Sequence, residues 1–421
     1  MAKSNLAARL ARIRTETPRA ERSDAVVRPS SLVSFAPSAM DFSAGWAAPS
    51  PLVRSRVVPS SRPIPGAPFL SPALGLLCPL SADAFPEGSP LDSRRLLFFD
   101  LETTGLSGGA GTVAFLAAFG RIRSDSGTPF LEITQHLLLD YPGEGEFIDL
   151  VLSVFAADPL PPVLVSYNGK SFDTQLLRSR CLMNGRKPPA LPHLDLVHGS
   201  RRLWTRMLPS CSLAEVERGI LGIDRGQDLG GAEAPDAWFD FLKHGETGRL
   251  IAICEHNLRD LEGLATLLFR MESIAGDPLR AAAAGEADAE GLALRWIAAL
   301  RAGRAEADGT AARNLLELAA EGGSPRCAWA LALTLAREGN AERAAELVRT
   351  VAEAKEGTAA AGLRVAACRR LARDAARRSR DYEAACGWIA RALAIAGEGS
   401  PLADGLRRAA LLYGRNGKTR E

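Results

Sequence analysis

Leu96-Leu-Phe-Phe-Asp-Leu-Glu-Thr-Thr-Gly-Leu106 is the stretch of this 421-residue chain that decides its predicted fold. The four apolar residues at its start fit a short buried strand and are too few for a helix. Side chains at i and i+2 of a strand share a face, so Asp100 and Glu102 would lie side by side. Carboxylates so placed repel each other unless a cation lies between them, usually a hard divalent one. A solvated acidic pair is the alternative.

A third acidic residue follows a second short strand. Residues 163–167 are predicted to form this strand, and residues 174–184 to form the helix after it. Asp173 lies at the start of that helix, where the helix dipole favours a negative charge and where it can reach a ligand beyond the strand. Asp173 could instead serve only as a helix cap.

A long helix is predicted over residues 248–271, because apolar side chains recur there at helical spacing. His256 and Asp260 are four residues apart and therefore share one face of it. A lone histidine on a helix is more often structural than catalytic. The pair is singled out because it is the third acidic motif along the chain, after Asp100 with Glu102 and after Asp173.

These motifs resemble those of the DnaQ-like, or DEDD, 3′–5′ exonucleases, and more closely those of the bacterial YprB-like ribonuclease-H-like group. The matching strings are 167–173, 193–195, 202–204, 213–217 and 256–260. The resemblance implies an α/β domain over residues 91–275, with an RNase H-like mixed five-stranded sheet flanked by helices. It also implies metal-dependent 3′–5′ exonuclease activity, which is phosphodiester hydrolysis by a two-metal mechanism.

The same resemblance implies the site. Asp100, Glu102, Asp173 and Asp260 would hold two divalent cations, Mg²⁺ or Mn²⁺, with His256 as general base. The 3′ end of single-stranded DNA or RNA would be the substrate. The residues expected to contact its terminal nucleotide are Thr103, Thr104, Gly105, Leu106, Asn168 and Phe172. The His-type relatives usually place the histidine one residue farther from the aspartate, which leaves the role of His256 open.

Other polar residues have two interpretations each. Asp195 is either a further carboxylate of the site or a structural residue at a helix start. Arg201, Arg202 and Arg206 could contact phosphates or could form a solvated face.

The domain is predicted to be preceded by an arm and followed by a helical tail. Residues 1–90 hold half of the 26 prolines and lack a sustained period, which predicts a disordered or loosely attached arm. Residues 280–416 are rich in Ala, Arg, Leu and Glu and predict an all-α domain of helical hairpins that resembles tetratricopeptide repeats. A plain helical bundle is the alternative. The predicted helices are 289–302, 310–321, 325–338, 341–354, 358–379 and 381–396.

Composition limits the class of protein. Seven scattered cysteines without a Cys-x-x-Cys pair argue against a zinc site or a disulfide framework and favour a reducing, cytoplasmic location. No apolar run approaches the roughly 20 residues of a membrane helix. A formal net charge of +2 means that any nucleic-acid contact must be locally basic. The alternative function is an inert RNase H-like scaffold whose helical tail binds a protein partner.

Overall fold

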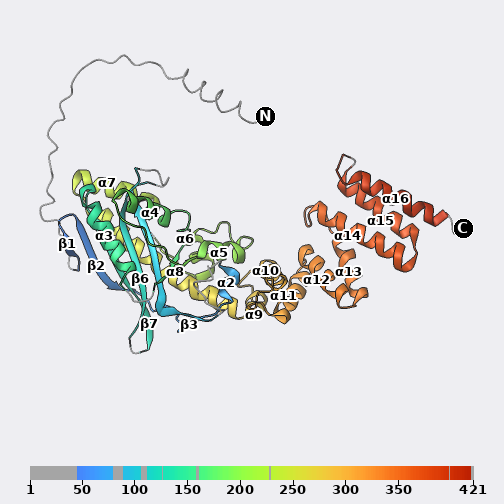
Figure 1. The fold of residues 1–421 in the computed structure, drawn as a ribbon, viewed down its shortest axis with the longest axis horizontal. Coiled ribbons are helices and arrows are strands. Elements are labelled where there is room, and N and C mark those ends of the chain that lie inside the picture. The colour runs from blue at the N-terminus through green and yellow to red at the C-terminus, as the bar shows by residue number, and fades with distance from the viewer. Residues whose placement is uncertain are drawn as a thin grey trace, which may run out of the picture. The chain divides into compact units, whose positions relative to one another are not determined.

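A mixed β-sheet is the centre of the structure, which is a computed structural model describing residues 45–78, 89–105, 111–125, 127–157, 161–226, 229–397 and 399–418. In these ranges seven strands form the sheet, in the order β1-β2-β7-β6-β5-β8-β9 (Figure 1). Strand β2 pairs antiparallel with β1 and with β7, and β6 pairs antiparallel with β7 and with β5. Strand β8 pairs parallel with β5, and β9 pairs parallel with β8. The bounds are β1 Ala47–Ser50, β2 Val53–Pro59, β5 Leu96–Thr103, β6 Ala114–Asp125, β7 Thr128–Leu138, β8 Val163–Ser166 and β9 His193–Asp195. A separate pair joins β3 (Phe69–Leu70) to β4 (Leu91–Asp92).

One face of the sheet is covered by helix α3 (Glu144–Phe155). The rings of Phe99 on β5 and Phe119 on β6 stack with centroids 5.3 Å apart. Phe155 of α3 meets both rings at an angle, with centroids 5.9 and 5.3 Å away. These offset and edge-on arrangements are the ones that aromatic side chains prefer, so α3 is fixed on this face.

The other face is covered by helix α8 (Gly248–Gly276), which packs across β5, β6 and β7. Asp100, Ala118, Gln135 and Arg56 are direct cross-strand partners on β5, β6, β7 and β2. Direct partners in a sheet point to the same face. The register therefore places one row of side chains beneath α8, with the first acidic residue at its end.

The remaining helices surround the sheet and continue beyond it. They are α2 Leu74–Leu77, α4 Asp173–Met183, α5 Leu196–Trp204, α6 Leu213–Val216, α7 Ala234–His244 and α9 Pro278–Ala283. Short 3-10 helices lie at Ser93–Arg95, Tyr141–Gly143 and Gly231–Glu233, and π-helical turns at Glu217–Leu221 and Ala375–Ser379. None of the helices in the described part of the chain combines the length and apolar character needed to cross a bilayer.

The C-terminal region is all-helical, as predicted, and each helix packs against the next along the chain. Its helices are α10 Ala289–Arg301, α11 Gly309–Glu321, α12 Pro325–Arg337, α13 Ala341–Glu353, α14 Ala361–Asp374, α15 Tyr382–Ala396 and α16 Ala403–Lys418. Trp204 at the end of α5 joins it to the sheet domain, because this fully buried ring donates Nε1–H to the Glu286 carbonyl at 2.9 Å. The likeness to tetratricopeptide repeats stays a prediction.

The predicted fold class is confirmed, but the sheet has two strands more than the predicted five, and the predicted arm over residues 1–90 is wrong for residues 45–78. Strand β2 pairs with β7 along its whole length, and Val53 is fully buried. The sequence signal was weak because arginine and serine alternate with few apolar residues in β2, and its pairing partner is far away in the chain. Residues 1–44 and 79–88 of the predicted arm lie outside the described residues.

Two valines of β2 test whether this strand belongs to the folded domain. Val53 is fully buried and Val57 is 60% exposed. We expect Val53→Asp to lower the free energy of unfolding by roughly 3 kcal/mol or more, because it buries an unpaired charge. The matched Val57→Asp should change it by no more than about 0.5 kcal/mol. Urea unfolding measures both, and equal small effects would show that β2 does not contribute to the core.

Candidate active site

Four acidic side chains from three separate elements gather above the end of β5. Asp100 and Glu102 lie on β5, Asp173 is the first residue of α4, and Asp260 lies on α8. Burial raises the pKa of Asp100 and of Glu102 well above its usual value, and the charges of Asp260 and Asp173 raise both further. Burial also raises the pKa of Asp173 to about 7, helped by the nearby carboxylate of Asp195. The predicted carboxylates are therefore close enough to oppose one another's ionisation.

His256 belongs to the same group. One ligand atom each of Glu102, His256 and Asp260 can be chosen so that all lie within 4.8 Å of one another. His256 Nε2 is 3.5 Å from Asp260 Oδ2. The backbone of Gly231 borders the group, since a Cβ there would lie 3.8 Å from Glu102 Oε2 and 3.9 Å from His256 Nε2. Two carboxylates and one imidazole thus face a common point.

Arg225 balances part of this negative charge. Its Nη1 pairs with Oδ1 of Asp260, and its Nη2 lies 2.6 Å from Oε1 of the buried Glu217. Gly263 of α8 makes room for Glu217, because a Cβ at Gly263 would lie 1.6 Å from that Oε1. Sequence reasoning missed Arg225, since nothing near it in the chain marks it as the partner of a residue on α8.

Asn257 holds Asp100 through a buried chain of hydrogen bonds. Arg56 Nε donates to Gln135 Oε1 at 2.8 Å, and Gln135 Nε2 donates to Asn257 Oδ1 at 2.8 Å. Asn257 Nδ2 in turn donates to Asp100 Oδ2 at 2.6 Å. Gln135 and Asn257 are both fully buried, and Ala118 lies between Gln135 and Asp100 in the register. The small side chain of Ala118 is consistent with Asn257 bonding both Gln135 and Asp100.

Asp195 is a structural residue that fixes the turn before Asp173. Its carboxylate accepts the backbone N–H groups of Asn168 at 2.7 Å, Lys170 at 3.0 Å and Val197 at 3.2 Å. Asn168 adopts a left-handed φ of 64°, which asparagine tolerates better than most residues. The structural interpretation of Asp195 thus accounts for its contacts, and the turn delivers Asp173 to the site.

Of the residues predicted to contact a terminal nucleotide, those that the structure describes adjoin this group along the chain or in the turn before Asp173. Thr103 ends β5 and donates from Oγ1 to the Gly105 carbonyl at 2.9 Å, and Thr104 between them is half-buried. Phe172, just before α4, has 52% of its surface exposed. Leu106 lies outside the described residues. Their contacts with a nucleotide stay a prediction.

A double-mutant cycle tests the bond between Asn257 and Asp100. Asn257→Ala and Asp100→Ala should be non-additive in the free energy of unfolding, with a coupling of about 1.5–3 kcal/mol, as for hydrogen bonds to charged groups. The cycle cancels the relief of charge repulsion that Asp100→Ala brings by itself. Asn257→Ala with Asp92→Ala, a carboxylate paired with Arg94, is the control and should be additive. Additivity in both cycles would remove Asn257 as the support of Asp100.

Comparison with solved structures finds partial likenesses. E. coli exonuclease I in complex with a dT13 oligonucleotide is 19% identical, with a TM-score of 0.29, over 44% of this chain and 43% of that one. The zinc-bound form of its complex with single-stranded DNA is 20% identical, with a TM-score of 0.25, over 39% of this chain and 45% of that one.

Comparison of sequences gives the family of the sheet domain. The chain is 39% identical over 183 residues to the uncharacterized protein YprB of Bacillus subtilis (strain 168). That match covers 43% of this chain and 42% of YprB, so the chain spans less than half the length of this curated relative. Residues 97–271 match the family model of the RNase_H superfamily. The domain built on β5, α4 and α8 is therefore an RNase H-like domain.

Proposed function

We propose that the RNase H-like domain is a metal-dependent exonuclease of the DEDD type, which hydrolyses phosphodiester bonds at the 3′ end of single-stranded DNA or RNA. The observation that carries the proposal is the crowding of Asp100, Glu102, Asp173 and Asp260, where burial and mutual repulsion raise the pKa of the first two. Such crowding is unfavourable in a chain without a cation, and a divalent cation would offset it.

The donor atoms fit a hard cation. Asn257 engages Oδ2 of Asp100, and Arg225 engages Oδ1 of Asp260. The other oxygens, Oδ1 of Asp100 and Oδ2 of Asp260, would bind a cation together with the carboxylates of Glu102 and Asp173, and Oδ2 of Asp260 also lies 3.5 Å from His256 Nε2. An all-oxygen set of this kind suits Mg²⁺ or Mn²⁺. Two such cations, when bound, would activate a water and stabilise the leaving 3′-oxygen.

Other residues of the chain would position the substrate and move a proton. His256 Nε2 lies in the group formed with Glu102 and Asp260, where it could accept a proton from the attacking water. The exposed ring of Phe172 offers a base a stacking surface. Thr103, Thr104, Gly105, Leu106 and Asn168 would contact the terminal nucleotide.

Hydrolysis of labelled oligonucleotides tests the proposal. DNA and RNA of one sequence, labelled at the 5′ end, should shorten in single-nucleotide steps from the 3′ end when Mg²⁺ or Mn²⁺ is added. Asp100→Ala should lower the rate by at least about 100-fold, because even indirect supports of a metal are commonly worth 10- to 100-fold. Asp404→Ala on α16, whose side chain is 78% exposed, is the matched control and should keep the wild-type rate.

Three outcomes would contradict the proposal. Shortening from the 5′ end would reverse its polarity, and internal fragments would make the domain an endonuclease. Absence of any product with either nucleic acid and either cation would favour the inert scaffold.

Thermal unfolding tests cation binding without activity. Mn²⁺ at 100 times its Kd should stabilise the wild-type chain by about 2.7 kcal/mol. Asp100→Asn should be at least as stable as the wild type in EDTA, because a buried like charge is removed, and should gain little from Mn²⁺. Asp404→Asn should respond as the wild type does. An equal Mn²⁺ response in Asp100→Asn would place the cation elsewhere.

A further inference from the structure

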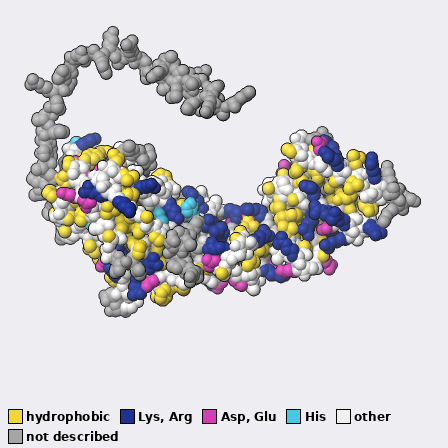
Figure 2. Space-filling view, in the orientation of Figure 1, with side chains coloured by type: hydrophobic (Ala, Val, Ile, Leu, Met, Phe, Trp, Pro, Cys, Tyr) yellow, Lys and Arg dark blue, Asp and Glu magenta, His cyan; other side chains and the backbone are white. Residues whose placement is uncertain are grey.

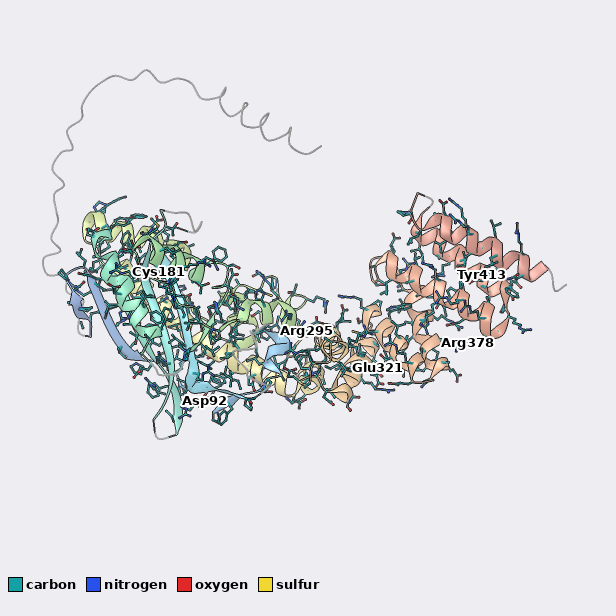
Figure 3. All side chains as sticks on the ribbon, viewed as in Figure 1. Asp92, Cys181, Arg295, Glu321, Arg378 and Tyr413 are labelled. Carbon is teal, nitrogen blue, oxygen red and sulfur yellow. The ribbon has the colours of Figure 1, made fainter. Side chains whose placement is uncertain are left out.

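A basic feature lies where α5 meets the helical region. A cavity of about 330 Å³ is lined by Arg201 and Arg202 of α5, by Arg206 just after α5, by Arg295 of α10 and by Arg326 of α12. Figure 3 labels Arg295 close to the place where Figure 1 labels α2, α5 and α10. Lys and Arg side chains are also numerous over the helical region in Figure 2. The sequence had left Arg201, Arg202 and Arg206 with two interpretations, a phosphate contact or a solvated face.

Part of the positive charge of the cavity is neutralised within the protein. Arg206 pairs with Asp288 and, at 3.1 Å, with Glu290. Arg326 also pairs with Glu290 at 3.1 Å. Arg201, Arg202 and Arg295 have no carboxylate partner among the residues that the structure describes. The lining therefore keeps an excess of positive charge.

Two of these arginines are held in place by backbone carbonyls. Arg202 Nη1 donates to the Leu77 carbonyl, and Arg295 Nε donates to the Leu76 carbonyl at 2.5 Å. Burial lowers the pKa of both guanidinium groups, and the charge of Arg202 lowers the pKa of Arg295 further. Their charges thus lie together in partly buried surroundings, where an anion would be stabilising.

We propose that this arginine pocket binds backbone phosphates of the same single strand whose 3′ end enters the carboxylate site. The inference rests on the proposed function. Asp195, just before α5, holds the turn that carries Asp173, and Arg202 follows it by seven residues, or about 10 Å along a helix. A strand leaving the site along α5 would reach the pocket. Phosphate contacts of this kind give affinity without reading the base sequence.

Oligonucleotide binding to the full-length chain tests the pocket separately from catalysis. The chain carries Asp100→Ala and is kept in EDTA, so that no hydrolysis occurs, and the probes are fluorescent (dT)20 and (U)20. Arg201→Gln should weaken binding about fivefold at about 0.1 M salt, and should lower the slope of log K against log salt by about 0.7. Arg201 is the best choice because it is exposed and no internal bond of it is lost. Arg349→Gln, an exposed arginine of α13, makes the same change of charge away from the pocket and should bind as the parent does.

Several results would contradict the proposal that this pocket binds backbone phosphates. One is equal affinity and equal salt slope for Arg201→Gln and Arg349→Gln. Another is displacement of the probe by oligoglutamate as readily as by an unlabelled oligonucleotide of the same charge, which would indicate an acidic protein partner. Binding that depends on Arg201, together with no nuclease activity of the wild-type chain with Mg²⁺ or Mn²⁺, would support the pocket and contradict the proposed exonuclease. Nuclease activity with no effect of Arg201→Gln on binding would do the reverse.

Discussion

The buried hydrogen-bond chain from Arg56 to Asp100 is the constraint on which the site depends. An arginine can only donate, so Gln135 must turn its oxygen toward Arg56 and its nitrogen toward Asn257. Asn257 then has only its nitrogen to offer Asp100, and it requires an acceptor there. This bond favours the ionised carboxylate and so opposes the rise in pKa that burial and the neighbouring charges cause at Asp100.

Asp260 is also held by a donor side chain. Arg225 holds one oxygen of Asp260, as Asn257 holds one oxygen of Asp100. One oxygen of each of these two carboxylates is therefore held by a side chain of the protein. Groups held by such a supporting layer need little rearrangement to bind a ligand. Crowded carboxylates in fixed positions favour the binding of a cation, in keeping with the proposed mechanism.

Sequence reasoning could find the acidic residues because each follows a local pattern. Asp100 and Glu102 end an apolar strand, Asp173 opens a helix after a strand, and the spacing of His256 and Asp260 is helical. The supports of these residues could not be found in this way. Gln135 and Arg225 owe their roles to partners on α8 that are far away in the chain, and β2 becomes a strand only by pairing with β7. Tertiary pairing, and not local propensity, decides such positions.

Helix α5 relates the carboxylate site to the helical region. Asp195 at its start is bonded to the turn that precedes Asp173, and Trp204 at its end is buried against the start of the helical region. A helix of nine residues spans about 13 Å and is stiff at that length, so the distance between its two ends is set. Because Arg295 of α10 and Arg326 of α12 line the same cavity as Arg201 and Arg202 of α5, the helical region supplies part of the proposed phosphate pocket. On this view the helical region contacts the substrate strand itself, and its attachment through Trp204 serves the proposed nuclease directly.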